Sequence, residues 1–297
     1  MGQLVLPRRI APVRPLESSV MASHPYQTCG DEFSRNDLDR IVAETLVEHT
    51  DYHPKLESTN DRALEITREG DDFHAATLVL ADRQTAGRGR GENRWWSGAG
   101  ALTFSLLLPN ESLSLPPADK PKTSLVAGLA VGDAIEQLVR GEKAQLKWPN
   151  DVYLRGRKVC GILVEAIDGS GGVLVIGIGV NVNNSLSNAP DDLRSTATAL
   201  CDVTGRAVPR TDLLVVILQH LELQLRKLRS GDSQLQRRWQ ERCLLTGQTI
   251  HVDTPSRQLV GVCRGIDDHG ALLLEIGTSV ERCLTGVVTL RPSSLDS

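Results

Sequence analysis

The sequence predicts an α+β protein, with helices and strands interleaved in one large domain and a small β-barrel after it. Two observations lead to this prediction. Helical periodicity alternates with short apolar runs over residues 34–245, and short β-rich segments follow from about Thr246. A chain of 297 residues is long enough for this arrangement. We therefore divide it into residues 34–245, residues 246–297 and an extension, residues 1–33, that we expect to be disordered.

Composition excludes several classes of protein. The net charge of −4 argues against a general nucleic-acid binder, which usually carries a strong basic excess. The chain contains no run of 18 apolar residues, so we expect no membrane association, and its first thirty residues lack the apolar core of a signal peptide. The six cysteines form no CxxC pair and are expected to be reduced thiols of a cytoplasmic protein.

The first half of the large domain contains two predicted helices and two predicted strands. "SRNDLDRIVAETLV" has helical spacing, with Ser34 or Asn36 as N-cap. "ESTNDRALEITREG" starts with polar capping residues at 58–60 and ends at Gly70, which suits a helix stop. "HAATLVLADRQ" and "ALTFSLLL" are short apolar runs typical of strands.

The second half contains a convincing helix, three strand-like runs and a further long helix. "KTSLVAGLAVGDAIEQLVR" is the helix. The runs "QLKW", "KVCGILVEAI" and "GVLVIGIGVNV" are separated by the turn-like "RGRK" and "DGSGG", which favours antiparallel neighbours. "TDLLVVILQHLELQLRKLRS" is amphipathic with Thr211 as the candidate N-cap, and "SQLQRRWQERC" continues helically.

The pattern of the last fifty or so residues predicts a small β-barrel. "TIHVD", "QLVGVCRGID", "ALLLEIG" and "VTLR" are strand-like, with turn signals such as "DDHG" between them. A unit of this size lies near the lower limit for independent folding, so we expect it to pack on the large domain.

The loop "QTAGRGRGENRWWS" follows the first apolar run. Its glycines, Gly87, Gly89 and Gly91, let backbone N–H groups approach a ligand, and Arg88 and Arg90 add donors suited to phosphate or carboxylate oxygens. The loop is neither a P-loop nor a dinucleotide fingerprint. Taken alone, it fits a solvated basic turn equally well.

"KWPNDVYL" is the second unusual stretch. Pro149 fixes its own φ and favours an extended residue before it, so the turn holds Lys147, Asn150 and Asp151 in fixed directions at a strand end. Trp148 is expected in the core.

Two further positions have both a structural and a functional interpretation. Lys158, at the head of an apolar strand, is either a surface lysine or the cation of a polyanionic reaction centre. Asn181 and Asn183 follow a glycine-rich strand, where asparagine forms turns or reads a sugar hydroxyl or a carbonyl.

Together these motifs resemble those of biotin protein ligases. The resemblance covers about residues 50–297 and includes "ESTN", "QTAGRGR" with "WWS", "KWPNDVYL", "GRKVCGILVE", "GIGVNVN" and "VGVCRGIDDHGALLLE" in order. It implies a central mixed sheet flanked by helices, as in class II synthetases, with an SH3-like C-terminal barrel. It also implies an ATP- and Mg²⁺-dependent reaction through biotinyl-5′-AMP that modifies a lysine of a biotin carboxyl carrier protein or domain.

The resemblance carries roles to individual residues. Catalytic roles fall on Lys158, Arg90 and Asp151, and Asp151 is also the expected Mg²⁺ ligand. Biotin contacts fall on Ser58, Thr59, Asn60, Gln84, Arg88, Gly89, Arg90, Lys158 and Gly161. ATP or adenylate contacts fall on Arg88, Arg90, Lys147, Asn150, Lys158 and Asn181. The chain departs from the family at Glu92, where a glycine is usual, and at Asn93, where a basic residue is usual.

Three alternatives remain beside this prediction. A lipoate or octanoate ligase shares the superfamily, although the arginine–glycine loop, "KWPND" and the tail favour biotin. The presence of both Lys158 and the arginine loop argues against a non-catalytic biotin-binding sensor. A DNA-binding regulator is disfavoured by charge and by the missing helices of a winged helix-turn-helix before "ESTN". A homodimer is left open.

Overall fold

The structure, a computed structural model, describes residues 32–69, 74–109, 115–167, 172–231 and 234–290. Most of the predicted N-terminal extension, Gly70 and nearly all of "DGSGG" lie outside these residues. A seven-stranded mixed sheet forms the centre, in the order β1-β2-β3-β7-β6-β5-β4. Only β1 and β2 pair in parallel. The strands are β1 His49–His53, β2 Thr77–Ala81, β3 Leu102–Pro109, β4 Ala144–Lys147, β5 Asp151–Leu154, β6 Arg157–Ile167 and β7 Val173–Val180.

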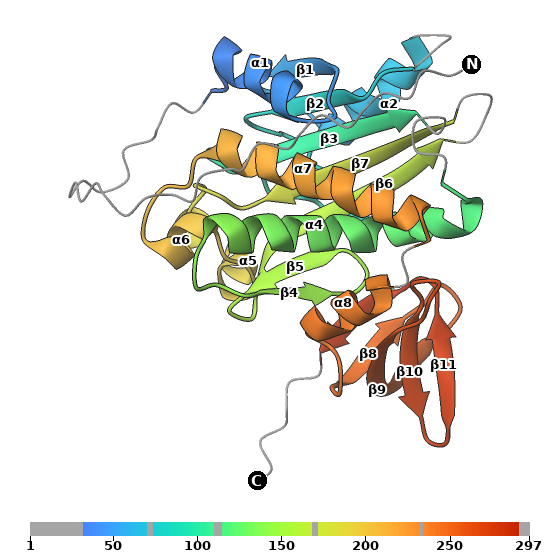
Figure 1. Ribbon diagram of the computed structural model, residues 1–297. Coiled ribbons are helices and arrows are strands. Elements are labelled where there is room, and N and C mark those ends of the chain that lie inside the picture. The colour runs from blue at the N-terminus through green and yellow to red at the C-terminus, as the bar shows by residue number, and fades with distance from the viewer. Residues whose placement is uncertain (1–31, 70–73, 110–114, 168–171, 232–233, 291–297) are drawn as a thin grey trace, which may run out of the picture.

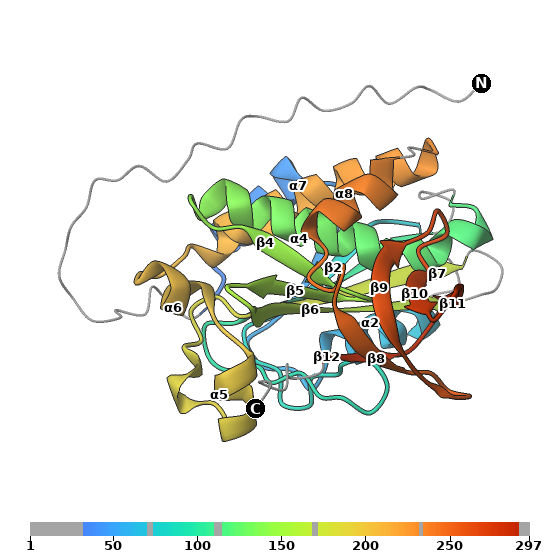
Figure 2. The same ribbon diagram turned by 90° about the horizontal axis from the view of Figure 1, so that it is seen from below.

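Helices cover both faces of this sheet (Figures 1 and 2). On one face lie α4 (Thr123–Leu138) and α7 (Arg210–Arg229), with α1 (Arg35–Glu44) against α7. Helix α4 is apolar almost all round and buried along most of its length, as expected of a helix between a sheet and other helices. On the other face α2 (Thr59–Glu69) packs on β3 and β7 through a smaller apolar cluster. The predicted fold class is thus confirmed.

The predicted N-cap is present in α1 and absent in α7. Ser34 caps α1 through a capping box with Asp37, as predicted. Thr211 does not cap α7, because that helix begins at Arg210 after Pro209, and Thr211 Oγ1 donates to Asp37 Oδ1 at 2.9 Å instead. The short elements β1, β5, α5 (Asp191–Thr196), α6 (Leu200–Thr204) and β11 (Ser279–Cys283) were not predicted.

Strand β5 lies between two strands that the sequence suggested were neighbours. It joins β6 through a two-residue turn at Arg155 and Gly156, whose φ values are 49° and 73°, as a type I′ hairpin requires. The pairing then shifts by one residue, because Tyr153 is opposite Lys158 whereas Val152 is opposite Cys160. This β-bulge leaves Val159 as the extra residue of β6.

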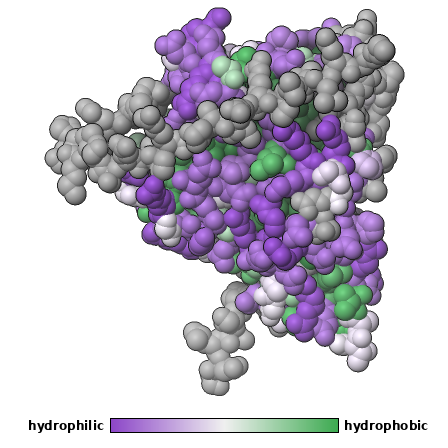
Figure 3. Space-filling model, viewed as in Figure 1, coloured by the Kyte–Doolittle hydropathy of each residue, from purple (hydrophilic) through white to green (hydrophobic). Residues whose placement is uncertain are grey.

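The C-terminal region forms a five-stranded antiparallel sheet, consistent with an SH3-like domain, in the order β11-β10-β9-β8-β12. Its other strands are β8 Thr249–Asp253, β9 Gln258–Ile266, β10 Leu272–Ile276 and β12 Val287–Leu290. Apolar residues show on this domain within a mostly hydrophilic face in Figure 3.

Helix α8 (Gln234–Arg242) connects this sheet to the large domain through a half-buried ion network. Arg238 and Arg242 bind opposite oxygens of the Asp133 carboxylate on α4, at 2.8 and 2.9 Å. Gln224 of α7 donates to the same carboxylate at 3.1 Å. One carboxylate therefore links α4, α7 and α8.

The described cysteines are all free. Within the described ranges, no helix has the length and apolar character needed to cross a membrane.

Replacing Asp133 by alanine should lower the free energy of unfolding by about 2 kcal/mol, because two arginines lose their partner in a mostly buried place. Urea denaturation measures the change. The control is Asp39→Ala, which breaks an exposed pair with Arg35 on α1 and should cost less than about 0.5 kcal/mol. Equal losses in the two variants would show that the network does not hold α8.

Candidate active site

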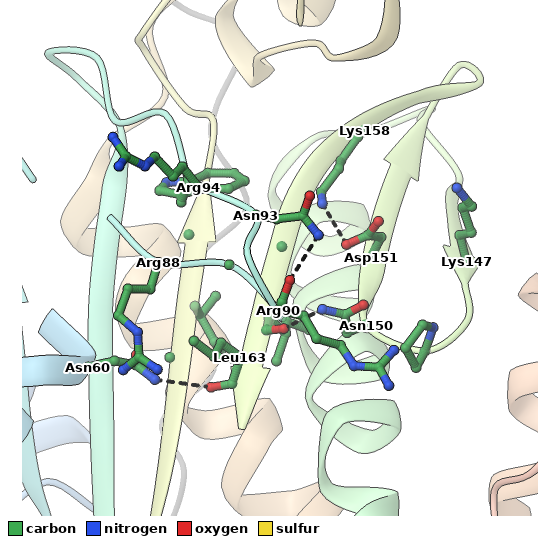
Figure 4. A pocket seen from close by; sticks show the side chains of 18 of the residues that line it. Asn60, Arg88, Arg90, Asn93, Arg94, Lys147, Asn150, Asp151, Lys158 and Leu163 are labelled. Atoms are coloured by element: carbon green, nitrogen blue, oxygen red, sulfur yellow. Dashed lines mark hydrogen bonds and ion pairs between the residues drawn. The ribbon is translucent and has the colours of Figure 1, made fainter. Parts of the chain in front are cut away.

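A cleft of about 350 Å³ lies where the large sheet meets the C-terminal domain (Figure 4). Its lining comes from the start of α2, the loop after β2, the "KWPND" turn, β6, β7 and the C-terminal strand β12. The cleft is lined by every predicted site residue except Asn181: Ser58, Thr59, Asn60, Gln84, Arg88, Gly89, Arg90, Lys147, Asn150, Asp151, Lys158 and Gly161.

The start of α2 is fixed by Gln84. The backbone N–H and the hydroxyl of Thr59 both donate to Gln84 Oε1, at 2.7 and 3.0 Å. Ser58 Oγ accepts from the N–H of Asp61, which is the N-cap contact predicted for this polar stretch. The predicted polar residues therefore hold one another at the edge of the cleft.

Asn60 is buried in a network that the sequence did not reveal. Its Oδ1 accepts from Ser105 of β3 at 2.7 Å, and its Nδ2 donates to Glu165 of β6 at 2.9 Å. Ser105 is the one polar residue among the leucines of "ALTFSLLL" apart from Thr103, and Glu165 ends "GILVE". An isolated polar residue inside an apolar strand was the available signal for both.

Three glycines, Gly161, Gly177 and Gly179, form what we call the glycine floor of the cleft. A Cβ at Gly177 would lie 1.9 Å from Asn60 Oδ1, and one at Gly179 would lie 2.4 Å from the Trp95 ring. The floor therefore lets Asn60 and Trp95 lie directly on the backbone of β7. Of these glycines, only Gly161 was predicted as a site residue.

The ion pair of Lys158 and Asp151 stands at one end of the floor. Lys158 Nζ lies 2.7 Å from Asp151 Oδ1, and a Cβ at Gly161 would lie 3.4 Å from the same Nζ. The β6 bulge explains this placement. In a regular strand, Lys158 and Gly161 would point to opposite faces, whereas the extra residue brings both to the cleft.

The "KWPND" turn is held by both neighbouring units. Asn150 Nδ2 donates to the carbonyl of Ile162 at 2.6 Å. Trp148 is buried, as expected, and donates to the carbonyl of Gly270 in the C-terminal domain at 3.1 Å. Lys147 Nζ stands 5.8 Å from the centroid of the Tyr153 ring, and burial lowers the pKa of this lysine.

The arginine–glycine loop folds back on itself. Arg88 pairs with Arg94 in an isolated antiparallel bridge, and Gly89 N–H donates to the Asn93 carbonyl at 2.8 Å. Asn93 Nδ2 donates to the carbonyl of Arg90 at 2.8 Å and closes the turn, in which Gly91 has a φ of 64°. Asn93, a departure from the family pattern, thus stabilises the loop.

The two arginines of this loop diverge, Arg88 toward Asn60 and Arg90 toward Asn150 (Figure 4). Arg88 binds Glu165 at 2.8 Å and Asp61 at 2.7 Å, and the bond to Glu165 is the main cause of its raised pKa. Arg90 donates to the carbonyl of Gly286 at 2.6 Å and to the hydroxyl of Thr285. Burial lowers the pKa of Arg90, and Asp151 opposes that effect.

Asn181 lies outside the cleft lining. It is buried, its Nδ2 donates to the Thr198 carbonyl at 3.1 Å, and its Oδ1 accepts from Asn184 at 2.9 Å. Its side chain orders the chain after β7, so the turn-forming interpretation describes its contacts. Cys160 is fully buried and is not among the residues that line the cleft, and burial raises the pKa of its thiol.

The arrangement suits anionic ligands. Five cations line the cleft, in which Asp151 is the sole carboxylate among the lining residues that the structure describes; the cations are Arg88, Arg90, Arg94, Lys147 and Lys158. A flat glycine floor and the bulk of Trp95 suit a planar, partly apolar group. The cleft can therefore hold an apolar acid beside a phosphate.

Two family profiles match this chain. Residues 52–183 match the Biotin/lipoate A/B protein ligase family, and residues 245–291 match the Biotin protein ligase C terminal domain.

Curated relatives and solved structures agree. The chain is 33% identical over 254 residues to the bifunctional ligase/repressor BirA of Bacillus subtilis, covering 84% of this chain and 76% of that protein. It is 36% identical over 230 residues to the biotin–[acetyl-CoA-carboxylase] ligase of Paracoccus denitrificans, covering 74% and 91%. It resembles the Aquifex aeolicus biotin protein ligase in complex with biotin and ATP, with a TM-score of 0.70, 29% identity and coverage of 83% and 100%.

Gly177→Ala should destabilise the protein by roughly 1–3 kcal/mol, because its methyl group would displace the buried Asn60 side chain. The matched control is Gly128→Ala in α4, where the nearest atom to the new Cβ would be 3.5 Å away. That change should be neutral or should stabilise the helix by up to about 1 kcal/mol. Urea unfolding compares the two. A parent-like midpoint for Gly177→Ala would mean that the floor tolerates a side chain.

Proposed function

The chain belongs to the Biotin/lipoate A/B protein ligase family, and we propose that it is an ATP-dependent ligase that attaches biotin to a carboxylase. The observation that best supports this proposal is the cleft, in which Lys158, Asp151 and the arginine–glycine loop surround a glycine floor. The C-terminal match favours biotin over lipoate, because it is to a biotin protein ligase domain.

We assign the first step to the Lys158 end of the cleft. The biotin carboxylate attacks the α-phosphorus of ATP, an oxygen–phosphorus bond forms, and pyrophosphate leaves with the electron pair of the broken bond. Both reactants are anions, so Lys158 and Arg90 offset their repulsion and stabilise charge at phosphorus. Orientation of two bound reactants contributes up to about 7–11 kcal/mol in favourable cases.

Biotin itself is assigned to the glycine floor and the start of α2. Ser58, Thr59, Asn60 and Gln84 offer polar atoms at its edge, and Arg88 and Gly89 cover it from the loop. Because Asn60 and Arg88 already bind Glu165, this glutamate positions both of them.

The phosphates of ATP are assigned to Lys147, Asn150 and Arg90, and the metal ion that would accompany these phosphates is Mg²⁺. Mg²⁺ keeps several waters and binds substrate phosphates, so it needs only one or two protein carboxylates. Asp151 is the cleft carboxylate that meets this need, and the ion would supply neutralisation of phosphate charge.

In the second step a neutral lysine amine of the acceptor attacks the acyl carbon of biotinyl-5′-AMP. An amide bond forms, the amine loses a proton, and AMP leaves. The loop, folded over the floor, keeps water from this hydrolysable anhydride. The partner is a biotin carboxyl carrier protein or domain.

We also propose a domain boundary, a ribose contact, a cellular location and the absence of a nucleic-acid partner. The division at residues 245/246 follows the change in composition, and a ribose contact by Asn181 would require its present hydrogen bonds to rearrange. A cytoplasmic location is supported by the free thiols of the described cysteines. The net charge of −4 speaks against nucleic-acid binding.

The activity is tested by incubating the protein with biotin, Mg-ATP and a purified carrier domain, and then measuring the carrier's mass. A gain of one biotinyl group is expected, with none when lipoate replaces biotin or when the acceptor lysine is replaced by arginine. Transfer of lipoate alone would show that the protein is a lipoate ligase instead, and no transfer of either acid would refute ligase function.

Lys158→Ala should reduce biotin-dependent exchange of pyrophosphate into ATP by about 100-fold or more, because the charge nearest the reacting anions is lost. Lys143→Ala removes a lysine whose side chain is 86% exposed and serves as the matched control, with parent-like exchange expected. Circular dichroism checks folding of both variants. Near-normal exchange by a folded Lys158→Ala protein would remove Lys158 from the mechanism.

A further inference from the structure

The two loop arginines differ in how their charge is compensated. Arg88 is bound by two carboxylates, Glu165 and Asp61. Arg90 is held by neutral oxygens, the Gly286 carbonyl and the Thr285 hydroxyl. In the described part of the chain, no carboxylate lies within ion-pair distance of Arg90, and Asp151 acts on it only from further away, so no direct ion pair neutralises its charge at the cleft.

The oxygens that hold Arg90 come from the other domain. Thr285 and Gly286 lie in the short connection between β11 and β12, about 195 positions later in the chain. This connection packs closely on β8 at Gly286, where a Cβ would lie 2.8 Å from Val252 Cγ1. Gly286, Val287 and Val288 themselves line the cleft, so the contact is made at its wall.

Arg90 also lies between two cavities. It lines the cleft and a neighbouring groove of about 540 Å³, between the start of α4, the "KWPND" turn and the C-terminal domain. A guanidinium free to rotate here would sample both spaces. Two hydrogen bonds to its terminal nitrogens restrict it to one orientation, because the planar fork of arginine directs its donors.

We propose that Thr285, together with the Gly286 carbonyl, is a positioning residue that orients Arg90 toward the anionic reactant without neutralising it. A carboxylate in the same place would hold Arg90 equally well but would cancel the charge that a phosphate needs. The C-terminal domain thereby contributes to ATP and adenylate binding through a residue of the large domain. The inference rests on the proposed function of the cleft.

The test compares Thr285→Val with Thr285→Ser in pyrophosphate exchange. Valine keeps the size of threonine and loses the hydroxyl, so KM for ATP should rise about three- to tenfold, with a smaller change in kcat. Serine restores the hydroxyl and should restore KM. Thr289→Val, an exposed threonine of β12 outside the cleft lining, is the matched control and should behave as the parent.

A double-mutant cycle with Arg90→Ala shows whether the change in KM caused by Thr285→Val depends on Arg90. If Thr285 acts through Arg90, Thr285→Val should add nothing to KM once Arg90 is gone. Full additivity, an unchanged KM in Thr285→Val, or failure of serine to rescue would each overturn the proposal. A variant that only unfolds more easily would lower the melting temperature and leave KM unchanged, which also contradicts it. A parent protein without exchange activity would refute the proposed function instead.

Discussion

The cleft depends on one extra residue in β6. Opposite β5, the pairing shifts between Val152 and Tyr153, and Val159 is the residue left over. Beyond the shift, Gly161 and Glu165 point to the same side as Lys158, although an odd spacing separates them from it. The face that carries the cation therefore also carries the bare floor and the carboxylate that holds Asn60 and Arg88. A regular strand would turn either the cation or the floor into the core.

The positive charge available to a ligand in the cleft depends on which groups already bind each basic side chain, and not only on how many basic residues line the cleft. Asp151 lies against Lys158, and Glu165 with Asp61 compensates Arg88. Arg90 is fixed by oxygens without formal charge. A site that must attract phosphate and still keep its donors ordered needs this combination, since every carboxylate that orders an arginine also weakens its pull on an anion.

Local sequence predicted the long elements, and the motifs with their family resemblance supplied just under half of the residues that line the cleft. The long apolar run of α4, the amphipathic pattern of α7 and the motifs around Lys158 and Asp151 can all be recognised without knowing which residues they contact. Strands as short as β1, β5 and β11 carry too few residues for a pattern, and pairing with neighbours determines them. The Asn60 network and the contact of Arg90 with Gly286 join residues about 45 to 195 positions apart, which no local pattern encodes. Thr211 was predicted as a cap by residue type, but the chain direction set by Pro209 started α7 earlier.

The Asp133 network bears on how such chains can exchange parts during evolution. Helix α8 precedes the C-terminal sheet and is bound to α4 and α7 through Arg238 and Arg242. The sheet in turn places Gly286 at the cleft. A recombination breakpoint just before β8 would join the recipient's α8 to the donor's C-terminal sheet. The recipient's α8 would then determine how the sheet packs on the large domain, whereas the loop that contacts Arg90 would come from the donor. A hybrid that keeps both the ion network and the Arg90 contact would therefore need α8 and the C-terminal sheet from one parent.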